Sequence, residues 1–224
     1  MIQFINVSKR YNHDIIALDS VNVSVDKGEF VFLVGPSGSG KSTFLKLMIK
    51  EEEPTTGKIL IDNKDIGRLK PKEVPFLRRK IGFVFQDFRL LYDRTVEENI
   101  TFALRVIEAS EREIKTQLKS VLEMVGMQGR EKFYPNQLSG GEQQRIALAR
   151  ALATKPPIII ADEPTGNLDP NTAGEIFKTL IDINSRGTTV LVVTHDRNIV
   201  NQLNKRVIAL DHGKVIKDEQ KGGY

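Results

Sequence analysis

Two kinds of hydrophobic pattern alternate along the chain. The short, continuously apolar runs FVFLV (30–34) and IGFVF (81–85) are typical of buried strands. The runs PIIIADE (157–163) and TTVLVVTH (188–195) have the same character, and the only proline starts its run, where a strand tolerates it. A helical pattern, KSTFLKLMIK (41–50), follows a glycine-rich turn after the first run. Strands that alternate with helices predict an α/β fold with a mostly parallel core sheet.

The pattern becomes helical between residues 87 and 155. Segments 95–109 and 110–126 each carry apolar residues at helical spacing on one face, and Gly126 is placed to end the second. We interpret residues 87–155 as an α-helical subdomain inserted into the core. Both segments begin with the capping-box pattern, which pairs Thr95 with Glu98 and Ser110 with Glu113.

The first thirty residues show period-2 patches such as VNVSV (21–25), which predict antiparallel strands beside the core. A length of 224 residues suits one sizeable domain. We therefore predict a single domain, 1–224, in which residues 1–86 and 156–224 form the core with an antiparallel β subdomain. Residues 87–155 form the helical subdomain of that domain.

Composition and charge exclude several classes of protein. The chain has no cysteine, which excludes disulfide frameworks and cysteine-ligated metal sites. The N-terminal stretch MIQFINVSKRYN lacks the apolar region of a secretory signal, and the longest apolar runs fall far short of the roughly 20 residues that span a bilayer. The net charge of +4 would suit an acidic partner or an anionic membrane surface, but basic and acidic residues are interspersed as on solvated helix faces. We expect a chain that does not cross a membrane by itself.

The segment GPSGSGKS (35–42) matches the phosphate-binding pattern G-x-x-x-x-G-K-[ST] between a predicted strand and a predicted helix. Its glycines let backbone amides approach phosphate groups, Lys41 would reach the β- and γ-phosphates, and the Ser42 hydroxyl would hold Mg²⁺. The motif predicts nucleotide binding but does not identify the reaction. The predicted nucleotide-binding residues of this loop are Gly35, Pro36, Ser37, Gly38, Ser39, Gly40, Lys41, Ser42 and Thr43.

Two adjacent acids end the apolar run at 157–163. Asp162, at the end of a buried strand, could hold the Mg²⁺ shell, and Glu163 could orient the attacking water as a general base. Adjacent acids also occur in solvated turns, but the upstream phosphate loop favours the catalytic interpretation. These residues predict phosphoryl transfer to water.

Three further residues are candidates for the same site. His195 follows an apolar strand on the side where α/β sheets bind ligands, so we expect it to contact the γ-phosphate or the attacking water. Gln86 directly follows the run 81–85, and its amide could reach Mg²⁺ or water. Tyr11 could stack on a nucleotide base, although a core or surface tyrosine would look the same in sequence.

The segment QLSGGEQQRIALAR (137–150) has the pattern of a helix start that could hold an anion. Ser139 stands at the N-cap and Glu142 follows three residues later, which makes a capping box. Gly140 and Gly141 leave the first amides bare, and a helix N-terminus attracts anions. One nucleotide has a single terminal phosphate, so a second phosphate site in the same chain needs an explanation.

These motifs, with ADEPTGNLD (161–169), occur in the order and spacing of the ATP-binding-cassette (ABC) ATPases, which the chain resembles over essentially its whole length. The resemblance implies a P-loop NTPase fold of ABC type, ATP hydrolysis with Mg²⁺, and a homodimer in the ATP state. In that family, ATP on one chain's P-loop is covered by the other chain's signature helix, the helix that begins at LSGGE, in a head-to-tail dimer. The implied residues in trans are Ser139, Gly140, Gly141 and, in the D-loop NLD (167–169), Asp169.

The resemblance also assigns roles to single residues. Tyr11 resembles the aromatic that stacks on adenine, Gln86 the residue that senses Mg²⁺ and the membrane partner, and His195 the switch histidine. The chain has neither the long coiled-coil or zinc-binding insertion of the DNA-repair members nor the tandem cassettes of the ribosomal members. The resemblance therefore implies that the chain works with a separately encoded integral membrane partner and does not bind nucleic acid.

The stretch FQDFRLLYDRTVEENI (85–100) resembles the cell-division branch of the family, which is understood to regulate peptidoglycan hydrolases from the cytoplasmic face of the bacterial plasma membrane. ATPases of lipoprotein-release or macrolide-export type are the alternative within the family. A monomeric P-loop kinase or GTPase and a nucleic-acid-binding cassette are alternatives of other classes. Four apolar residues would form either a groove for a partner helix or a packed hinge: Phe88, Leu90, Leu91 and Tyr92.

Overall fold

The computed structural model describes residues 1–12, 15–166 and 168–223. Its contacts divide the chain into two compact units. Unit 1 consists of Met1–Arg78 and Thr189–Tyr224, and unit 2 is Arg79–Thr188. The subdomain limits predicted from the sequence, 87 and 155, stay a prediction.

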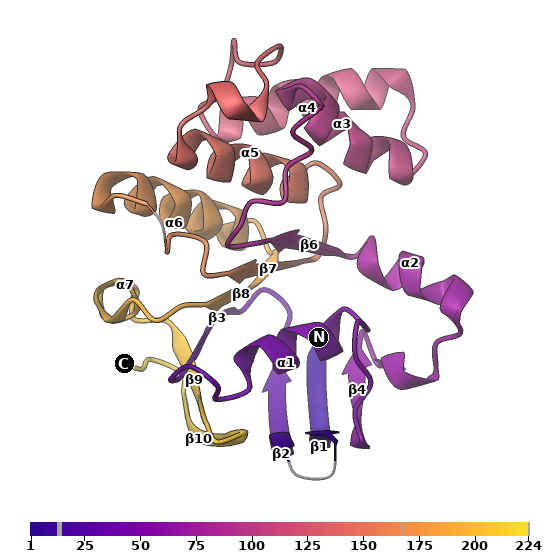
Figure 1. Cartoon of the computed structure of the whole chain (residues 1–224), viewed down its shortest axis with the longest axis vertical. Helices are drawn as coiled ribbons and strands as arrows, with labels where there is room; N and C mark the ends of the chain where they lie inside the picture. Colours follow the sequence, from indigo (N-terminus) through magenta and orange to yellow (C-terminus); the bar gives the residue numbers. More distant parts are fainter. Residues whose placement is uncertain (13–14, 167, 224) are drawn as a thin grey trace. The chain divides into compact units, whose positions relative to one another are not determined.

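Unit 1 contains the antiparallel sheet that the N-terminal pattern predicts (Figure 1). The strand order is β2-β1-β4-β5, and every neighbouring pair is antiparallel. Phe4 of β1 stacks on Phe44 with ring centroids 3.9 Å apart, so the sheet packs directly on the helix that follows the phosphate loop. The strands are β1 (Ile2–Tyr11), β2 (Ile15–Val25), β4 (Thr56–Ile61) and β5 (Lys64–Asp65).

The other strands of unit 1 form a mostly parallel arrangement. The strand β3 (Phe30–Val34) lies between β8 (Thr189–Val193) and β9 (Arg206–Asp211) and is parallel to both, while β10 (Lys214–Glu219) is antiparallel to β9. All residues of β3 and β8 are buried, as continuous apolar runs predict. The remaining elements are α1 (Lys41–Met48), two 3₁₀ turns (Ile66–Arg68 and Pro71–Glu73), α2 (Val74–Arg78) and α7 (Arg197–Leu203).

Unit 2 is built around one buried helix, α5 (Gly140–Leu152). The parallel strands β6 (Ile81–Val84) and β7 (Ile158–Asp162) come close to it, because a Cβ placed on Gly82 would lie 2.5 Å from the Ala151 carbonyl oxygen. Figure 1 shows α3 (Val96–Val106) and α4 (Glu111–Met124) on the side of α5 that is away from β6. The unit also contains a 3₁₀ turn (Pro135–Gln137) and α6 (Pro170–Ser185).

The observed strands and helices therefore confirm the α/β class that the sequence predicts, with a mostly parallel core and an antiparallel part. No helix among the described residues is long and apolar enough to cross a membrane.

All three predicted capping boxes are present in unit 2. Thr95, Ser110 and Ser139 each accept a hydrogen bond from the amide three residues later, and the glutamate there accepts one from the cap's own amide. These bonds lower the pKa of each glutamate below its ordinary value of 4.5. The main cause is the bond from the Thr95 amide for Glu98, the Ser110 hydroxyl for Glu113 and the Ser139 amide for Glu142.

We expect these caps to make the stability of unit 2 sensitive to acid. Because the folded pKa values are lowered, the unfolded chain binds more protons, and the stabilisation is complete above the unfolded pKa and lost as pH falls through the folded values. The triple variant Glu98→Gln, Glu113→Gln, Glu142→Gln keeps the boxes, since glutamine also caps, but removes their titration. Urea unfolding from about pH 6 to about pH 3 should show a shallower loss of stability for the variant. An unchanged pH dependence would contradict this account of the caps.

Candidate functional site

The phosphate loop of unit 1 connects β3 to α1 through backbone conformations that favour glycine. Gly35, Gly38 and Gly40 have φ values of 147°, 77° and 107°, in the region that L side chains rarely adopt. A Cβ on Gly35 would lie 2.1 Å from the Leu210 carbonyl oxygen, and one on Gly40 would lie 2.4 Å from that of Ala17. Gly35 and Gly40 are therefore required by both conformation and space, and Gly38 by conformation alone.

The start of α1 has no side chain of its own to occupy its first amides. Its N-cap is Gly40, in the left-handed conformation and without a side-chain cap. The Lys41 ammonium lies back over the loop, donating to the carbonyl oxygens of Gly35 at 2.7 Å and Pro36 at 2.8 Å. The Ser39 hydroxyl is buried and has no hydrogen-bond partner among the residues that the structure describes. A cationic loop with uncapped amides and a buried, unpartnered hydroxyl fits an oligophosphate.

Two other predicted residues of unit 1 lie at strand ends. Tyr11 ends β1, half-buried, with the Lys9 ammonium 4.9 Å from its ring centroid. His195 is exposed and follows β8 by two residues. The Thr194 hydroxyl accepts from the Asp196 amide, and the Asp196 carboxylate caps α7. These two neighbours therefore stabilise the turn that carries the histidine.

The predicted acids of unit 2 follow β7. Asp162 is the last residue of the strand, and Glu163 has a positive φ of 46°, which is uncommon for a residue with a side chain. A Cβ placed on Gly166 would lie 3.7 Å from the Gln86 amide nitrogen and 3.8 Å from the Glu163 Cβ. The structure thus places Gln86 and Glu163 beside the same turn.

The signature helix α5 begins as the sequence predicts. The Ser139 hydroxyl accepts from the Glu142 amide at 3.3 Å, and the Glu142 carboxylate accepts from the Ser139 amide at 2.9 Å. Glycine follows at the first two helical positions, Gly140 and Gly141, so no side chain covers the helix start there.

The start of α6 lies against the start of α5. Asp169 is the N-cap of α6 before Pro170, as predicted, and the bonds from Thr172 lower the pKa of its carboxyl. A Cβ on Gly141 would lie 2.6 Å from the Thr172 methyl carbon. Two residues predicted to act in trans, Gly141 and Asp169, are therefore neighbours, whereas Asn167 of the same D-loop lies outside the described residues.

Two polar residues of α5 were not identified from the sequence. Gln144 is buried and donates to the Pro164 carbonyl at 2.7 Å, directly after Glu163. Arg150 donates to the carbonyl oxygens of Phe88 and Arg89, just after Gln86, and burial lowers its pKa. The signature helix is thereby bonded to the segments that follow Gln86 and Glu163, two of the three segments that carry predicted catalytic groups. No sequence pattern identifies these two contacts.

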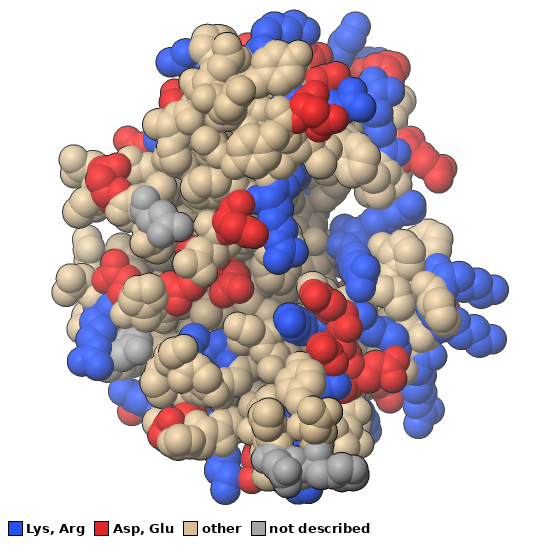
Figure 2. Space-filling model, viewed as in Figure 1, with Lys and Arg blue, Asp and Glu red and all other residues tan. Residues whose placement is uncertain are grey.

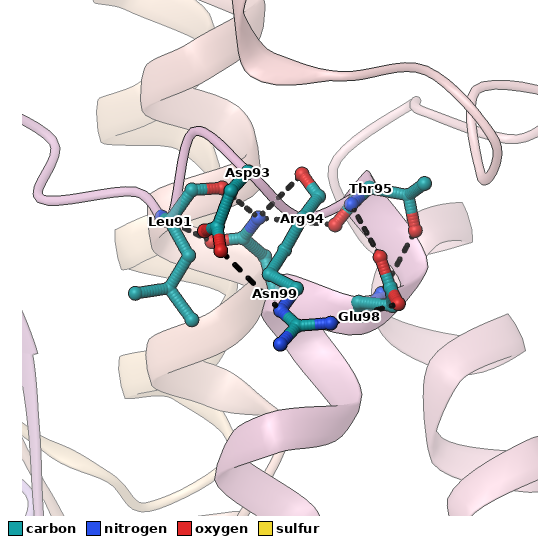
Figure 3. A network of polar contacts seen from close by, with 6 residues as sticks. All are labelled: Leu91, Asp93, Arg94, Thr95, Glu98 and Asn99. Atoms are coloured by element: carbon teal, nitrogen blue, oxygen red, sulfur yellow. Dashed lines mark hydrogen bonds and ion pairs between the residues drawn. The ribbon is translucent and has the colours of Figure 1, made fainter.

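A groove of about 400 Å³ opens on the surface of unit 2 beside α3. Its apolar residues include the exposed Leu91 and Phe102, and Leu90 is buried beneath the surface. Figure 3 shows how Asn99 shapes it: the buried amide exchanges hydrogen bonds with both Leu91 backbone groups and donates to the Arg94 and Thr95 carbonyls. The rim is charged, and the full lining is Leu91, Asp93, Arg94, Glu98, Thr101, Phe102 and Arg105.

The apolar residues of the segment 88–92 lie in different surroundings, and the choice between a partner groove and a hinge stays a prediction. Leu90 packs inward, as a hinge residue does, whereas Leu91 faces the groove. Tyr92 is exposed, and its hydroxyl lies 3.1 Å from the Gln143 amide oxygen, to which it donates.

The residues fit a Mg²⁺ ion that is bound together with phosphate. No group of three or more histidine, cysteine or acidic side chains that could hold a metal occurs in the part of the chain that the structure describes. Mg²⁺ commonly keeps several waters and is bound by one or two protein groups and the substrate phosphates. The Ser42 hydroxyl, in the first turn of α1, is of this kind.

Comparison with known protein families matches residues 18–166 to the family described as ABC transporter. The chain is 51% identical over its full length to the cell division ATP-binding protein FtsE of Bacillus subtilis and covers 98% of that protein. Identity to the protein of the same name is 49% in Mycobacterium tuberculosis, over 100% of the chain and 98% of the relative. In Escherichia coli it is 46%, over 95% of the chain and 96% of the relative.

Solved structures of ATP-binding cassettes also resemble the chain. The post-hydrolysis dimer of the ATP-binding cassette MJ0796 bound to ADP and Pi has a TM-score of 0.90 and 41% identity, and each chain is covered completely. The cassette cbiO1 of Clostridium perfringens, part of the transporter complex cbiONQ, has a TM-score of 0.91 and 30% identity, with 98% of this chain and 88% of that one covered.

Proposed function

The chain belongs to the ABC transporter family and is an ATPase of that family, and from this premise we propose that ATP-driven dimerisation of the chain works on a membrane partner in cell division. The observation that carries the cell-division role is the 46–51% identity to FtsE proteins over 95–100% of the chain. FtsE is also the branch that the sequence around Gln86 resembles.

The proposed ATP site uses the phosphate loop as its base. Backbone amides of residues 35–43 bind the phosphates, Lys41 neutralises the β- and γ-phosphates, and Tyr11 stacks on adenine. The uncapped start of α1 and the buried, unpartnered Ser39 hydroxyl support this assignment.

Hydrolysis is assigned to groups that follow β6, β7 and β8. Glu163 orients the attacking water and accepts its proton, and His195 contacts the γ-phosphate or that water. Ser42, Gln86 and Asp162 would hold Mg²⁺, which supplies charge neutralisation on the phosphate oxygens. The Gln144 bond to the Pro164 carbonyl supports a positioning role for α5, because it fixes the turn after Glu163.

The second phosphate site is proposed to act on the partner chain. Ser139, Gly140 and Gly141 present a helix start to the γ-phosphate of ATP bound on the other copy, and Asp169 contributes to the same interface. The contact between the start of α5 and the start of α6 supports a common surface. MJ0796, at 41% identity, is a cassette whose dimer is known.

The proposed partner is an FtsX-like integral membrane protein, which places the chain at the cytoplasmic face of the bacterial plasma membrane at the division site. Through that partner the chain regulates peptidoglycan hydrolases. The groove beside α3 suits a cytoplasmic helix of the partner, because exposed Leu91 and Phe102 are bordered by charges of both signs.

The variant Phe102→Asp tests this role. We expect it to reduce co-purification with an FtsX-like membrane protein by about tenfold or more, since it places a charge in an apolar contact. ATP binding by the isolated chain should not change. The control Ile216→Asp alters a residue of β10 with a similar exposed fraction, 65% against 56%, and should leave co-purification intact. Equal loss in both variants, or in neither, would count against the groove.

A further inference from the structure

A cavity of about 340 Å³ lies in unit 2 where three helical segments meet. One wall is a single face of α4, with Gln117, Ser120, Val121 and Met124 at the helical spacing i, i+3, i+4 and i+7. The other walls are the end of α5, the end of α6 and the residues that follow each helix. The volume lies in the range of small-molecule sites. This cavity, the α4 cavity, shares no lining residue with the predicted ATP site or with the groove beside α3.

The inner surface of the α4 cavity is apolar. Val121, Leu152 and Ile183 line it and are 3%, 6% and 6% exposed, so their positions are fixed by packing in unit 2. Met124 is half-buried, and its flexible thioether can adapt to the shape of a ligand. An apolar group that entered the cavity would leave water for a preformed apolar wall, which is favourable.

The charged groups of the α4 cavity are all positive. Figure 2 shows basic and acidic side chains interspersed on the face in view, so charge alone does not mark a site there. The described lining of the cavity, in contrast, holds two cations, Lys155 and Arg186, and no acid. Both are exposed, and neither makes an ion pair with another described residue. The nearest acids along the chain, Glu123 and Asp182, are exposed and lie outside the lining. The cavity therefore favours an anion.

The groups that would meet an anion stand on ordered backbone. The Lys155 amide donates to the Leu152 carbonyl at 2.9 Å, and the Arg186 amide donates to the Ile183 carbonyl at 3.1 Å. The Gln117 side chain is half-buried and has no hydrogen bond to another described residue, so its amide can donate to a ligand. Because the supporting turns are already formed, binding would order only side chains, at a low entropic cost.

We propose that the α4 cavity binds an amphipathic anion, which has a carboxylate or phosphate head group on a short apolar chain. The Lys155 ammonium and the Arg186 guanidinium bind the head group through charge-assisted hydrogen bonds. The chain lies against Val121, Leu152 and Ile183. An inorganic anion would leave the apolar wall in water, and a neutral apolar molecule would leave the cations without a partner. This ligand is neither ATP nor the membrane partner, so the site goes beyond the proposed function.

Methionine methyl groups of the purified full chain report on the cavity directly. The chain has four methionines; Met124 lines the cavity, whereas Met48 and Met127 are buried and do not. NMR spectra of methyl-labelled chain are recorded as octyl phosphate is added below its micelle concentration, with Met124→Leu to assign the signal. We expect a saturable shift of the Met124 signal and none of the Met48 signal. Octan-1-ol and inorganic phosphate, each with half of the required chemistry, should bind at least about tenfold more weakly.

Two further probes separate the sources of such a ligand. Octanoate represents a soluble carboxylate, and a short-chain lysophosphatidate represents a product of membrane lipid. Both should shift the Met124 signal, and the one that binds more tightly identifies the head group and the source.

Matched variants separate the lining cations from net charge and from helix stability. Lys155→Asn and Arg186→Gln should each weaken octyl phosphate binding about tenfold. Asparagine tolerates the φ of 50° at position 155, so the fold should be retained. Lys119→Gln on α4 and Lys178→Gln on α6 remove exposed charges outside the lining and should bind like the parent chain.

The proposal is overturned if the Met124 signal does not shift, if octan-1-ol or phosphate binds as tightly as octyl phosphate, or if the controls lose binding as much as the lining variants. It is also overturned if Lys155→Asn and Arg186→Gln lower the melting temperature while affinity is unchanged. The two cations would then stabilise the carboxyl ends of the helices that they follow.

Discussion

Replacing Glu163 by glutamine is expected to lower ATP turnover by about a hundredfold or more and to leave an ATP-bound dimer. Glutamine has nearly the shape of glutamate but cannot accept the proton of the attacking water. ATP would still bind and bring two chains together, while the step that separates them would be blocked. Phosphate release measures the first effect, and light scattering during gel filtration with ATP and Mg²⁺ measures the second.

The control for this variant is Glu123→Gln on the exposed face of α4, which removes the same charge far along the chain from β7. It should hydrolyse ATP at the parent rate and remain monomeric after turnover. A Glu163→Gln chain that keeps its turnover would remove Glu163 from the mechanism. One that stays monomeric at saturating ATP would contradict the role given to the signature helix.

Replacing Ser139 by aspartate is expected to abolish ATP-driven dimerisation without unfolding the helix. Aspartate caps a helix as well as serine does, so the stability of α5 should be retained. Its carboxylate, however, would oppose the γ-phosphate of the other chain. Like charges about 4 Å apart repel by about 4 kcal/mol at an effective dielectric constant of about 20, enough to weaken pairing by more than a hundredfold.

Asparagine at the same position separates the two roles of Ser139. Ser139→Asn keeps the cap and adds no charge, so it should dimerise far better than Ser139→Asp at a similar melting temperature. Both are made in the Glu163→Gln background, where the parent dimer accumulates. If the two variants dimerise alike, the helix start carries no phosphate of the other chain.

The sequence predicted the elements that depend on local pattern. The continuous apolar runs became β3, β6, β7 and β8, within one or two residues at the ends. Capping boxes were found because each needs only two residues three positions apart, as at Ser139 and Glu142. The phosphate loop was found for the same reason, and the space around Gly35 and Gly40 now explains its glycines.

Contacts between distant segments could not be read from pattern. Gln144 and Arg150 are polar residues in a helix that the sequence leaves free to be surface-exposed, and only the fold places them against the carbonyls of Pro164 and Phe88. Asn99 likewise has the appearance of an ordinary helix residue, yet its buried amide holds the turn that contains Leu91.

The sequence also did not show which residues of the segment after Gln86 are buried. Leu90 and Leu91 are adjacent and chemically identical, so composition could not show that the first packs inward and the second faces the groove. The Asp196 carboxylate accepts the amides that open α7, a role that the sequence did not show. Side chains that can bond to nearby backbone are difficult to assign before the local turn is known.

The central claim, that each ATP is held by the P-loop of one chain and the signature helix of the other, is tested most directly by mixing two defective chains. In the Glu163→Gln background, Lys41→Ala chains cannot hold ATP, and Ser139→Arg chains cannot cover the ATP of a partner. Neither should dimerise alone. A mixture should form heterodimers that hold one ATP, because the intact P-loop of one chain meets the intact Ser139 of the other. The claim is contradicted if the Glu163→Gln parent pairs in the presence of ATP but neither the mixture nor the separate chains do.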